Sequence, residues 1–496
     1  MYFDTLSSFL DAGKSRQDSR LAPRMSRRQF GSLAVVATVV AAFEPTASFA
    51  AETFDLRPDL DRLPLRQIKV SIAVRGELKL NADGKKVKHV PLRVDANLRY
   101  DERLPTADER LSHLAALRHY WDAKAEIQVG DTPFTTELRP ERRLIAVQAA
   151  DDQVTLFSPT GPLTREELEL IDVQGNCIVL AALLPEKPIE REASWPVPDR
   201  AIARLLCVEA ISQNDVQGTL KSVDGHVAVC HFAGTVQAAV GGVATEIELK
   251  AKCNFDLSQK LITWLAMAVK EQRSIGHAEP GFDVVSNVRV AIEPVAASEP
   301  LAEKSIAGLP LDVNSGSTLL SFDASKAHFR LLFDRRWRVM TDRHDVTILR
   351  LVDRGDLIAQ CNIASLPDLP AGRQLALEEL RDDIKQSLEK NAPQFVEATQ
   401  SVSDDGLRTL RTVVVGQVAE LPIQWVYYHL SNHDGRRASF VFTLENGLVE
   451  RFAEVDRALT DSFQFLPRPT PTESPAKKPE PSPTAAKTKS SAESRK

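Results

Sequence analysis

Residues 422–430, Pro-Ile-Gln-Trp-Val-Tyr-Tyr-His-Leu, decide the fold of the last large block of this chain. Aromatic and β-branched side chains occupy both alternating sets of positions, which predicts a strand that is at least half buried on both faces. Residues 432–435, Asn-His-Asp-Gly, suit a turn because Asp-Gly tolerates positive φ. Residues 437–443, Arg-Ala-Ser-Phe-Val-Phe-Thr, return the chain, so the stretch predicts an antiparallel hairpin.

Strands and helices alternate around this hairpin. Runs rich in β-branched residues predict further strands at 329–339, 346–352, 357–363 and 408–415. Two apolar stripes at helical spacing predict helices, one of which ends at Asn391-Ala392-Pro393. The stripes are Leu377, Leu380, Ile384 and Leu388, then Leu448, Phe452, Val455 and Leu459. An antiparallel sheet covered by helices is the economical way to bury them. The aromatic side chains of the hairpin are expected in its core, with a groove for a peptide or lipid as the alternative.

Three short segments give this block, residues 317–467, a resemblance to a known superfamily. They are Phe-Asp-Arg-Arg-Trp at 333–337, Ala-Gln-Cys-Asn-Ile at 359–363 and Gln-Trp-Val-Tyr-Tyr at 424–428. The block resembles the PsbP-like fold superfamily, an α/β/α sandwich found in photosystem accessory proteins and bacterial envelope proteins. The resemblance implies binding to other proteins and supplies no shared catalytic residues.

The composition bounds the class of protein. The chain has 496 residues, 43% of them hydrophobic and 26% charged, which is ordinary globular material with room for two or three domains. A formal net charge of -6 offers no basic field for nucleic acid. Residues 468–496 are rich in Pro, Ser, Thr and Lys without apolar periodicity, which predicts a disordered tail. The alternative for this tail is a loose contact with an anionic wall polymer or membrane surface.

Residues 1–50 have the features expected of an export signal, in which Met25 is a candidate true start. Arg27 and Arg28 precede Phe30 and an apolar run at 33–43, and Ser48-Phe49-Ala50 suits a signal peptidase. The pattern resembles a twin-arginine (Tat) signal. The apolar run is only about 11 residues, too short to span a bilayer that needs ~20. We therefore expect a cleaved signal, export to the periplasm or cell envelope, and no transmembrane span in the mature chain. A general secretory signal with an accidental arginine pair is the alternative.

Residues 52–300 predict a β-rich module. Strict alternation at 68–80 and 88–100 predicts one hairpin, and 227–240 with 246–257 predicts another around Gly241-Gly242. The two resemble a degenerate repeat. Between them, Thr164 opens a helix expected to close at Leu184, and Asp199 opens one expected to reach Ile211. Residues 301–316 are the expected linker.

Three short segments of this module carry a second resemblance. They are Leu184-Pro185-Glu186-Lys187-Pro188, Ser194-Trp195 and Phe255-Asp256. Together they resemble an uncharacterised family of bacterial envelope proteins, which implies a curved β-rich module but no activity. The plan of curved sheets with helices between them is also similar to that of periplasmic lipid carriers of the LolA type. The expected fold class is therefore α+β and multidomain: curved antiparallel sheets with a few helices, then the α/β/α domain.

Cys230 and Cys253 are the one candidate pair among five cysteines. A two-residue turn at Gly241-Gly242 places them opposite each other on the apolar side, within reach of a disulfide. Two buried free thiols are the alternative, because a Tat substrate folds in the reducing cytosol. Cys177 and Cys207 are expected to pack in the core.

The chain contains no recognisable catalytic signature, cofactor motif or metal-ligand spacing. Ser387-Leu388-Glu389-Lys390 has the spacing of a Ser-x-x-Lys motif, but it lies on a helix without the companion motifs. His231 adjoins Cys230, and strand neighbours point to opposite faces. We therefore predict no catalytic, cofactor-binding or metal residues. The leading hypothesis is an exported, non-enzymatic envelope protein that binds a partner protein or cell-wall component. The alternatives are a periplasmic carrier of a small apolar or lipid ligand and, third, an uncharacterised secreted enzyme.

Overall fold

The computed structural model describes residues 52–468 except 60–63, 83–85, 106–113, 151–152 and 371. The signal residues Arg27, Arg28, Phe30 and Ala50 lie outside the described residues, as does the predicted tail beyond Arg468. The expectations for these segments stay predictions.

The N-terminal body is built on one antiparallel sheet of 13 strands. Its main path is β7 (Gln153–Phe157), β6 (Leu144–Ala150), β4 (Leu114–Val129), β3 (Lys86–Arg103), β2 (Leu65–Ala82), β15 (Gly281–Pro294), β14 (Leu261–Arg273), β13 (Val243–Asp256), β12 (Val227–Val240), β11 (Gln217–Asp224) and β9 (Ser194–Pro196). β5 (Thr132–Glu137) pairs with β4, and β10 (Ala210–Asn214) pairs with β12. The two expected hairpins are β2–β3 and β12–β13, and both belong to this single sheet because β2 also pairs with β15.

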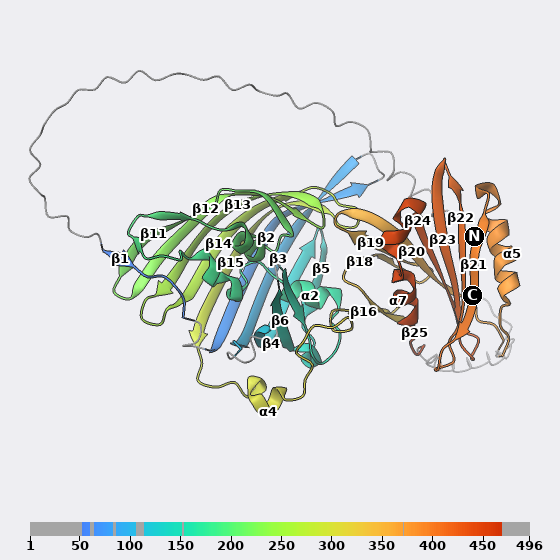
Figure 1. The fold of residues 1–496 in the computed structure, drawn as a ribbon, viewed down its shortest axis with the longest axis horizontal. Helices are drawn as coiled ribbons and strands as arrows, with labels where there is room; N and C mark the ends of the chain where they lie inside the picture. Colours follow the sequence, from blue (N-terminus) through green and yellow to red (C-terminus); the bar gives the residue numbers. More distant parts are fainter. Residues whose placement is uncertain are drawn as a thin grey trace, which may run out of the picture.

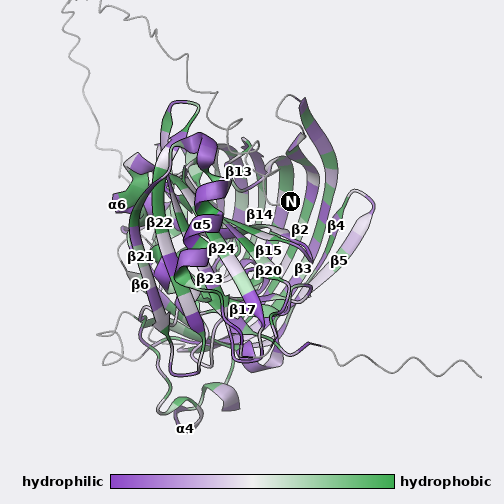
Figure 2. Ribbon diagram, turned by 90° about the vertical axis from the view of Figure 1, so that its right-hand side faces the viewer, coloured by the Kyte–Doolittle hydropathy of each residue, from purple (hydrophilic) through white to green (hydrophobic). Residues whose placement is uncertain are grey.

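The long strands give the sheet an inner and an outer face, and hydrophilic and hydrophobic residues alternate along them (Figure 2). Val70, Leu98 and Val288 point to the inner face and are buried, whereas their neighbours Lys69 and Arg99 on the outer face are exposed. The sheet curves around the helical segments (Figure 1). These segments are α2 (Arg165–Ile171), η4 (Cys177–Leu183) and α3 (Asp199–Leu206), with η3 (Pro140–Arg142) and the two-stranded pair β1 (Thr53–Phe54) and β8 (Ile189–Glu190) beside them.

Both expected helices of this body are shorter than predicted. The capping box is confirmed. The Thr164 side chain accepts a hydrogen bond from the backbone N–H of Glu167, and the Glu167 carboxylate accepts one from the backbone N–H of Thr164. However, α2 ends at Ile171, and Gly175, with a φ of +83°, turns the chain before η4. α3 ends at Leu206 because Cys207 takes the left-handed conformation with a φ of 55°, so the chain leaves the helix there.

The C-terminal body has a sheet of seven antiparallel strands, with the Trp425 strand inside it. The order is β18 (Trp337–Asp342), β19 (Thr347–Asp353), β20 (Asp356–Leu366), β24 (Arg437–Glu445), β23 (Leu421–Ser431), β22 (Arg408–Val418) and β21 (Gln394–Val402). One face packs against α5 (Leu377–Ser387), where Ile384 and Leu388 meet Trp425. The other face carries the Phe440–Phe442 cluster below α6 (Val449–Phe452) and α7 (Val455–Asp461). A small sheet of β16 (Leu320–Ala324), β17 (Phe329–Phe333) and β25 (Gln464–Phe465) lies beside α7, and η6 (Glu389–Asn391) and η7 (Asn446–Leu448) join the elements.

The expected α+β fold class, with an α/β/α sandwich, is wrong. Strands hold 55% of the described residues and helices 15%, so the protein is mostly β, and its β-rich character is confirmed. The physical reason is that the helical stripes are short. α5 spans 11 residues, α6 four and α7 seven, so strands β16, β17 and β25 complete the covering layer.

Guanidinium groups join the two bodies through main-chain carbonyls. Arg335 donates to the carbonyl of Leu156 at 2.6 Å, and Arg165 donates to the carbonyls of Arg335 at 2.6 Å and Trp337 at 3.1 Å. Burial, reinforced by Arg338, lowers the pKa of Arg165 to about 10, so the group stays charged at neutral pH. η5 (Glu299–Leu301), which leads into the predicted linker, and α4 (Glu303–Ile306), which lies within it, pack against the N-terminal body. The domain boundaries themselves stay a prediction.

Two glycine turns also touch where the bodies meet, and this contact is testable. A Cβ on Gly242 would lie 2.1 Å from the Cα of Gly355, whereas a Cβ on Gly241 would meet nothing within 4 Å. Both have positive φ, 69° and 56°, so alanine strains both backbones. We expect Gly242→Ala to lower the free energy of unfolding by about 1–3 kcal/mol more than Gly241→Ala, because only the first overpacks a contact. Urea denaturation measures the difference, and equal losses would contradict the contact.

Candidate functional site

A buried ionic network lies on the inner face of the large sheet. The register places Arg66 on β2 opposite Glu102 on β3, and Glu102 opposite Arg118 on β4. Arg66 Nη2 lies 2.6 Å from Glu102 Oε1, and Arg118 Nε lies 2.8 Å from Oε2. Glu102 is fully buried and Arg118 is 1% exposed. Two guanidinium groups therefore share one carboxylate away from water.

Polar groups from η4 complete this network. Arg118 Nη2 donates to Asn176 Oδ1 at 2.5 Å, and the Cys177 thiol donates to Glu102 Oε2 at 3.1 Å. Burial opposes ionisation of Glu102, but Arg66 and Arg118 prevail and hold its pKa at about 2. Burial and the Glu102 charge raise the pKa of Cys177 to about 11. Cys177 is therefore a protonated thiol, consistent with the expected packing role and unsuited to nucleophilic attack.

A cavity of about 200 Å³ opens beside the network, where several strands of the sheet end. Arg66, Cys177 and Arg204 lie along its polar side. Its apolar lining comes from Leu104, Val179, Leu180, Leu261, Ile262 and Ile292, all of which are buried hydrophobic residues. The cavity therefore joins an apolar wall to a cationic end.

A second polar cluster lies in the C-terminal body. Tyr428 donates to Asp456 Oδ2 at 2.7 Å, and Arg411 Nη2 lies 2.9 Å from the same carboxylate oxygen. Arg411 also pairs with Glu397 at 2.7 Å. Asp456 is 1% exposed and has a cation and a hydroxyl as partners, so this cluster ties α7 to the sheet.

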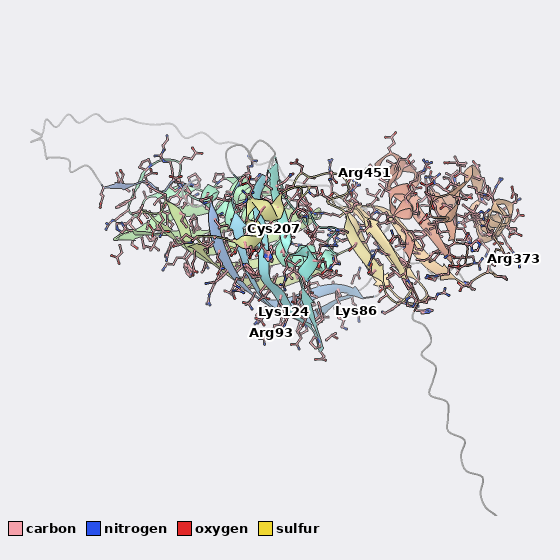
Figure 3. All side chains as sticks on the ribbon, turned by 90° about the horizontal axis from the view of Figure 1, so that it is seen from below. Lys86, Arg93, Lys124, Cys207, Arg373 and Arg451 are labelled. Atoms are coloured by element: carbon pink, nitrogen blue, oxygen red, sulfur yellow. The ribbon has the colours of Figure 1, made fainter. Side chains whose placement is uncertain are left out.

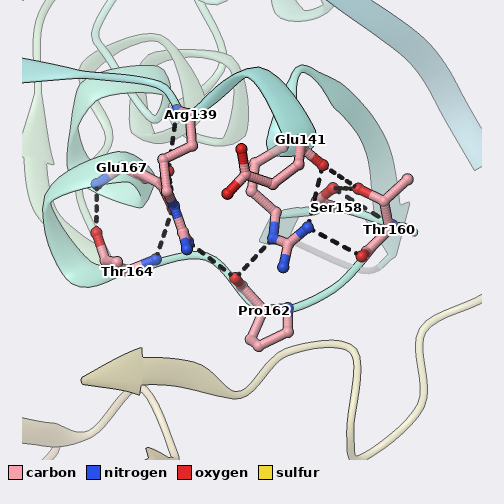
Figure 4. Close-up of polar contacts among 8 residues, drawn as sticks. Arg139, Glu141, Ser158, Thr160, Pro162, Thr164 and Glu167 are labelled. Carbon is pink, nitrogen blue, oxygen red and sulfur yellow. Dashed lines mark hydrogen bonds and ion pairs between the residues drawn. The ribbon is translucent and has the colours of Figure 1, made fainter. Parts of the chain in front are cut away.

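Two arginines hold the loop that leads into α2 (Figure 4). Arg139 pairs with Glu167 at 2.6 Å and donates to the carbonyl of Pro162 at 3.2 Å. Arg142 donates to the carbonyls of Pro162 and Thr160 at 3.0 Å each. These contacts position α2, from which Arg165 reaches the C-terminal body.

The cysteine register is confirmed, since Cys230 on β12 lies opposite Cys253 on β13. Both are fully buried, and the structure records all five cysteines as free. A hydrogen bond with Cys230, together with burial, raises the pKa of Cys253 well above its ordinary value. The disulfide stays a prediction.

The sequence interpretation missed Arg66, Glu102, Arg118 and the cavity. A signal was present, because the alternation that puts Ile68 and Tyr100 on the apolar face also puts Arg66 and Glu102 there.

Among the described residues, no cluster of three or more His, Cys, Asp or Glu could hold a metal ion. No helix of the described chain has the length and apolar character needed to cross a membrane.

The chain is thus a β-rich protein organised by one long antiparallel sheet, with a second, smaller sheet body. No protein-family model matches it, and no curated protein matches it. Among solved structures it is similar to cyanobacterial PsbP (CyanoP) from Synechocystis sp. PCC 6803, with 13% identity, 30% of this chain and 92% of that one covered, and a TM-score of 0.25.

Two further likenesses cover more of the chain. A lipovitellin structure is 7% identical, with 53% of this chain and 30% of that one covered and a TM-score of 0.28. OprB of Pseudomonas putida is 10% identical, with 78% and 93% covered and a TM-score of 0.13. At such TM-scores these likenesses carry no argument about the cavity or the function.

The ionic network predicts an asymmetric response to charge removal. Glu102→Gln leaves two buried guanidinium groups facing each other, so we expect a loss on the order of 3–5 kcal/mol in the free energy of unfolding. Glu126→Gln is the matched control, because Glu126 pairs with Lys124 at 3.4 Å on the exposed face of β4. Chemical denaturation should show almost no change for the control, and a similarly small change for Glu102→Gln would refute the network's role.

His429 predicts a loss of stability in acid. The residue is 2% exposed, and neither ring nitrogen has a hydrogen-bond partner among the described residues. Burial, then Arg437 and Arg408, lower the pKa of His429 to about 4. Because the unfolded state binds the proton more tightly, this contribution to stability is full above the ordinary pKa near 6.5 and is lost progressively as the pH falls from there through 4. Between pH 7 and pH 5 the loss is on the order of 2 kcal/mol. Urea titrations at pH 7 and pH 5 should show that His429→Leu removes this component and that His433→Leu, at an exposed turn, retains it.

Proposed function

We propose that this protein is an exported, non-enzymatic carrier that holds a small ligand with an apolar body and an anionic head in the cavity of its N-terminal sheet. The observation that carries the proposal is the combination of an apolar wall at Leu104, Ile262 and Ile292 with the guanidinium of Arg66 in one cavity. Among the functions that the sequence left open, this geometry favours the carrier over the binding of a partner protein. Binding of a partner protein stays a separate prediction, which follows from the resemblance of residues 317–467 to the PsbP-like superfamily.

The size of the cavity limits the ligand. Apolar cavities of about 150 Å³ hold benzene in other proteins. A cavity of about 200 Å³ suits a molecule somewhat larger, such as a short acyl chain. Long lipids would need more room than this.

The positive charge of the network beside the cavity favours a ligand whose head group is negatively charged. Within the described part of the chain, the carboxylate that Arg66 and Arg118 pair with is that of Glu102, so this hydrogen-bonded group carries a surplus positive charge. Burying an uncompensated charge is costly, and a bound carboxylate near Arg66 would offset part of that cost. Cys177, which lines the cavity, is held protonated and is therefore a poor nucleophile.

Filling the cavity should abolish binding. Ala181 lines the cavity, whereas Ala182, the next residue of η4, is exposed and does not. We expect the mature protein to bind sodium octanoate in titration calorimetry, and Ala181→Phe to weaken binding by about tenfold or more because the ring takes the ligand's space. Ala182→Phe should bind like the unmodified protein.

Two outcomes would overturn the proposal. One is octanoate binding that is indifferent to Ala181→Phe. The other is equal affinity for 1-octanol, which would show that the cationic end does not select an anionic head. Mass spectrometry of solvent extracts from the freshly purified protein gives an independent check, because a carrier should release an acidic amphiphile.

A further inference from the structure

A groove of about 350 Å³ crosses the outer face of the large sheet, from β4 over β3, β2 and β15 to β14. It lies on the face opposite the cavity. The register explains its shape, because one row across the strands reads Trp264, Ala291, Lys69 and Arg99. The next row places Arg289 beside Ser71. Short side chains between long ones leave a depression walled by Trp264 and the cations.

The walls are positively charged. Lys69, Arg99 and Arg289 line the groove against a single lining carboxylate, Asp122, which stands opposite Arg99 on β4. Lys69 already pairs with Glu293 at 3.0 Å. Within the described residues, Arg99 and Arg289 have neither an ion-pair nor a hydrogen-bond partner. Both are exposed, and their planar guanidinium groups match carboxylates in a bidentate way.

Trp264 adds a flat apolar surface at one end of the groove. Its side chain is half buried on the outer face, where alternate residues of β14 are Ala266 and Ala268. The indole is therefore flanked by methyl groups rather than by a competing large side chain. The apolar face of a sugar ring can pack on such a surface, while the ring hydroxyls stay in water.

We propose that this groove binds an acidic polysaccharide chain, with a sugar ring on Trp264 and carboxylates on Arg99 and Arg289. The two arginines stand two strands apart and in adjacent rows, so their Cα atoms are roughly 12 Å apart from the strand spacing and rise. An extended chain of a few sugar units spans that distance. The site is independent of the inner cavity and adds a wall-binding activity to the proposed carrier.

An acidic glycan fits this surface better than a nucleic acid does. Tight binding of a nucleic acid depends on many phosphate contacts along its backbone, whereas the groove offers only the three cations Lys69, Arg99 and Arg289 among its described lining residues. Arg93 and Lys124, labelled in Figure 3, lie on the same outer face, but each pairs with its own carboxylate, Asp95 and Glu126. The unpaired guanidinium groups therefore single out the groove on this part of the face.

The test uses the mature full-length protein and titration calorimetry with a hexamer of galacturonic acid. We expect binding that weakens as salt rises, with maltohexaose, its neutral counterpart, bound at least about tenfold less tightly. Arg99→Gln combined with Arg289→Gln should weaken hexagalacturonate binding by about 30-fold or more, since two charge-assisted contacts are lost. Trp264→Leu should weaken it by several-fold.

The matched control is Lys250→Gln combined with Lys270→Gln, which removes two charges from the same face outside the groove. It should change the affinity by no more than about threefold. The proposal is overturned if this control loses as much affinity as the groove variant, if hexathymidylate binds as tightly as hexagalacturonate, or if hexagalacturonate does not bind. Octanoate binding should survive in the groove variant, which separates this proposal from that of the inner cavity.

Discussion

The pairing of β2 with β15 is the constraint on which the rest of the molecule depends. Fourteen consecutive residue pairs, from Arg66 with Pro294 to Lys79 with Gly281, join segments about 200 residues apart in the chain. Closing such a loop costs conformational entropy before any contact is made, so the long ladder and its buried inner face must offset that cost. Both candidate sites lie along this seam. The cavity uses Arg66 and Ile292 from its two strands, and the outer groove uses Lys69 and Arg289.

The inner face shows why a charged network can persist in an apolar setting. Glu102 is satisfied by two arginines and by the Cys177 thiol, and Arg118 also reaches Asn176. Such a network is a weak source of net stability, because all three charged groups lose their hydration. The network instead positions η4 against the strands, and η4 supplies much of the cavity wall. The same side chains that order this end of the sheet therefore shape its ligand space.

The two bodies are joined by a different kind of interaction, namely hydrogen bonds to backbone carbonyls and a close contact between two turns. Arg165 and Arg335 donate to backbone carbonyls across the junction, and the turns at Gly242 and Gly355 meet without side chains. Carbonyl acceptors carry no net charge, so these contacts depend on exact placement rather than on charge matching. The sequence gives no sign of these contacts, because it identifies the stretch around Arg335 only as part of the C-terminal block.

The sequence by itself determined the local features. Alternation predicted the β2–β3 hairpin and the Trp425 strand, the Gly-Gly turn predicted the register of Cys230 with Cys253, and Thr164 with Glu167 predicted a helix start. Each depends on residues that are close in the chain. The tertiary structure alone decided that β2 pairs with β15, that the two hairpins share one sheet, that strands complete the layer over the C-terminal sheet, and that Arg66, Glu102 and Arg118 converge. The reason is physical. Alternation of apolar and polar residues along a strand shows which face of the strand is buried, but the backbone donors and acceptors at the edge of a strand can pair with many other strands. Only the packing of the whole chain selects one partner.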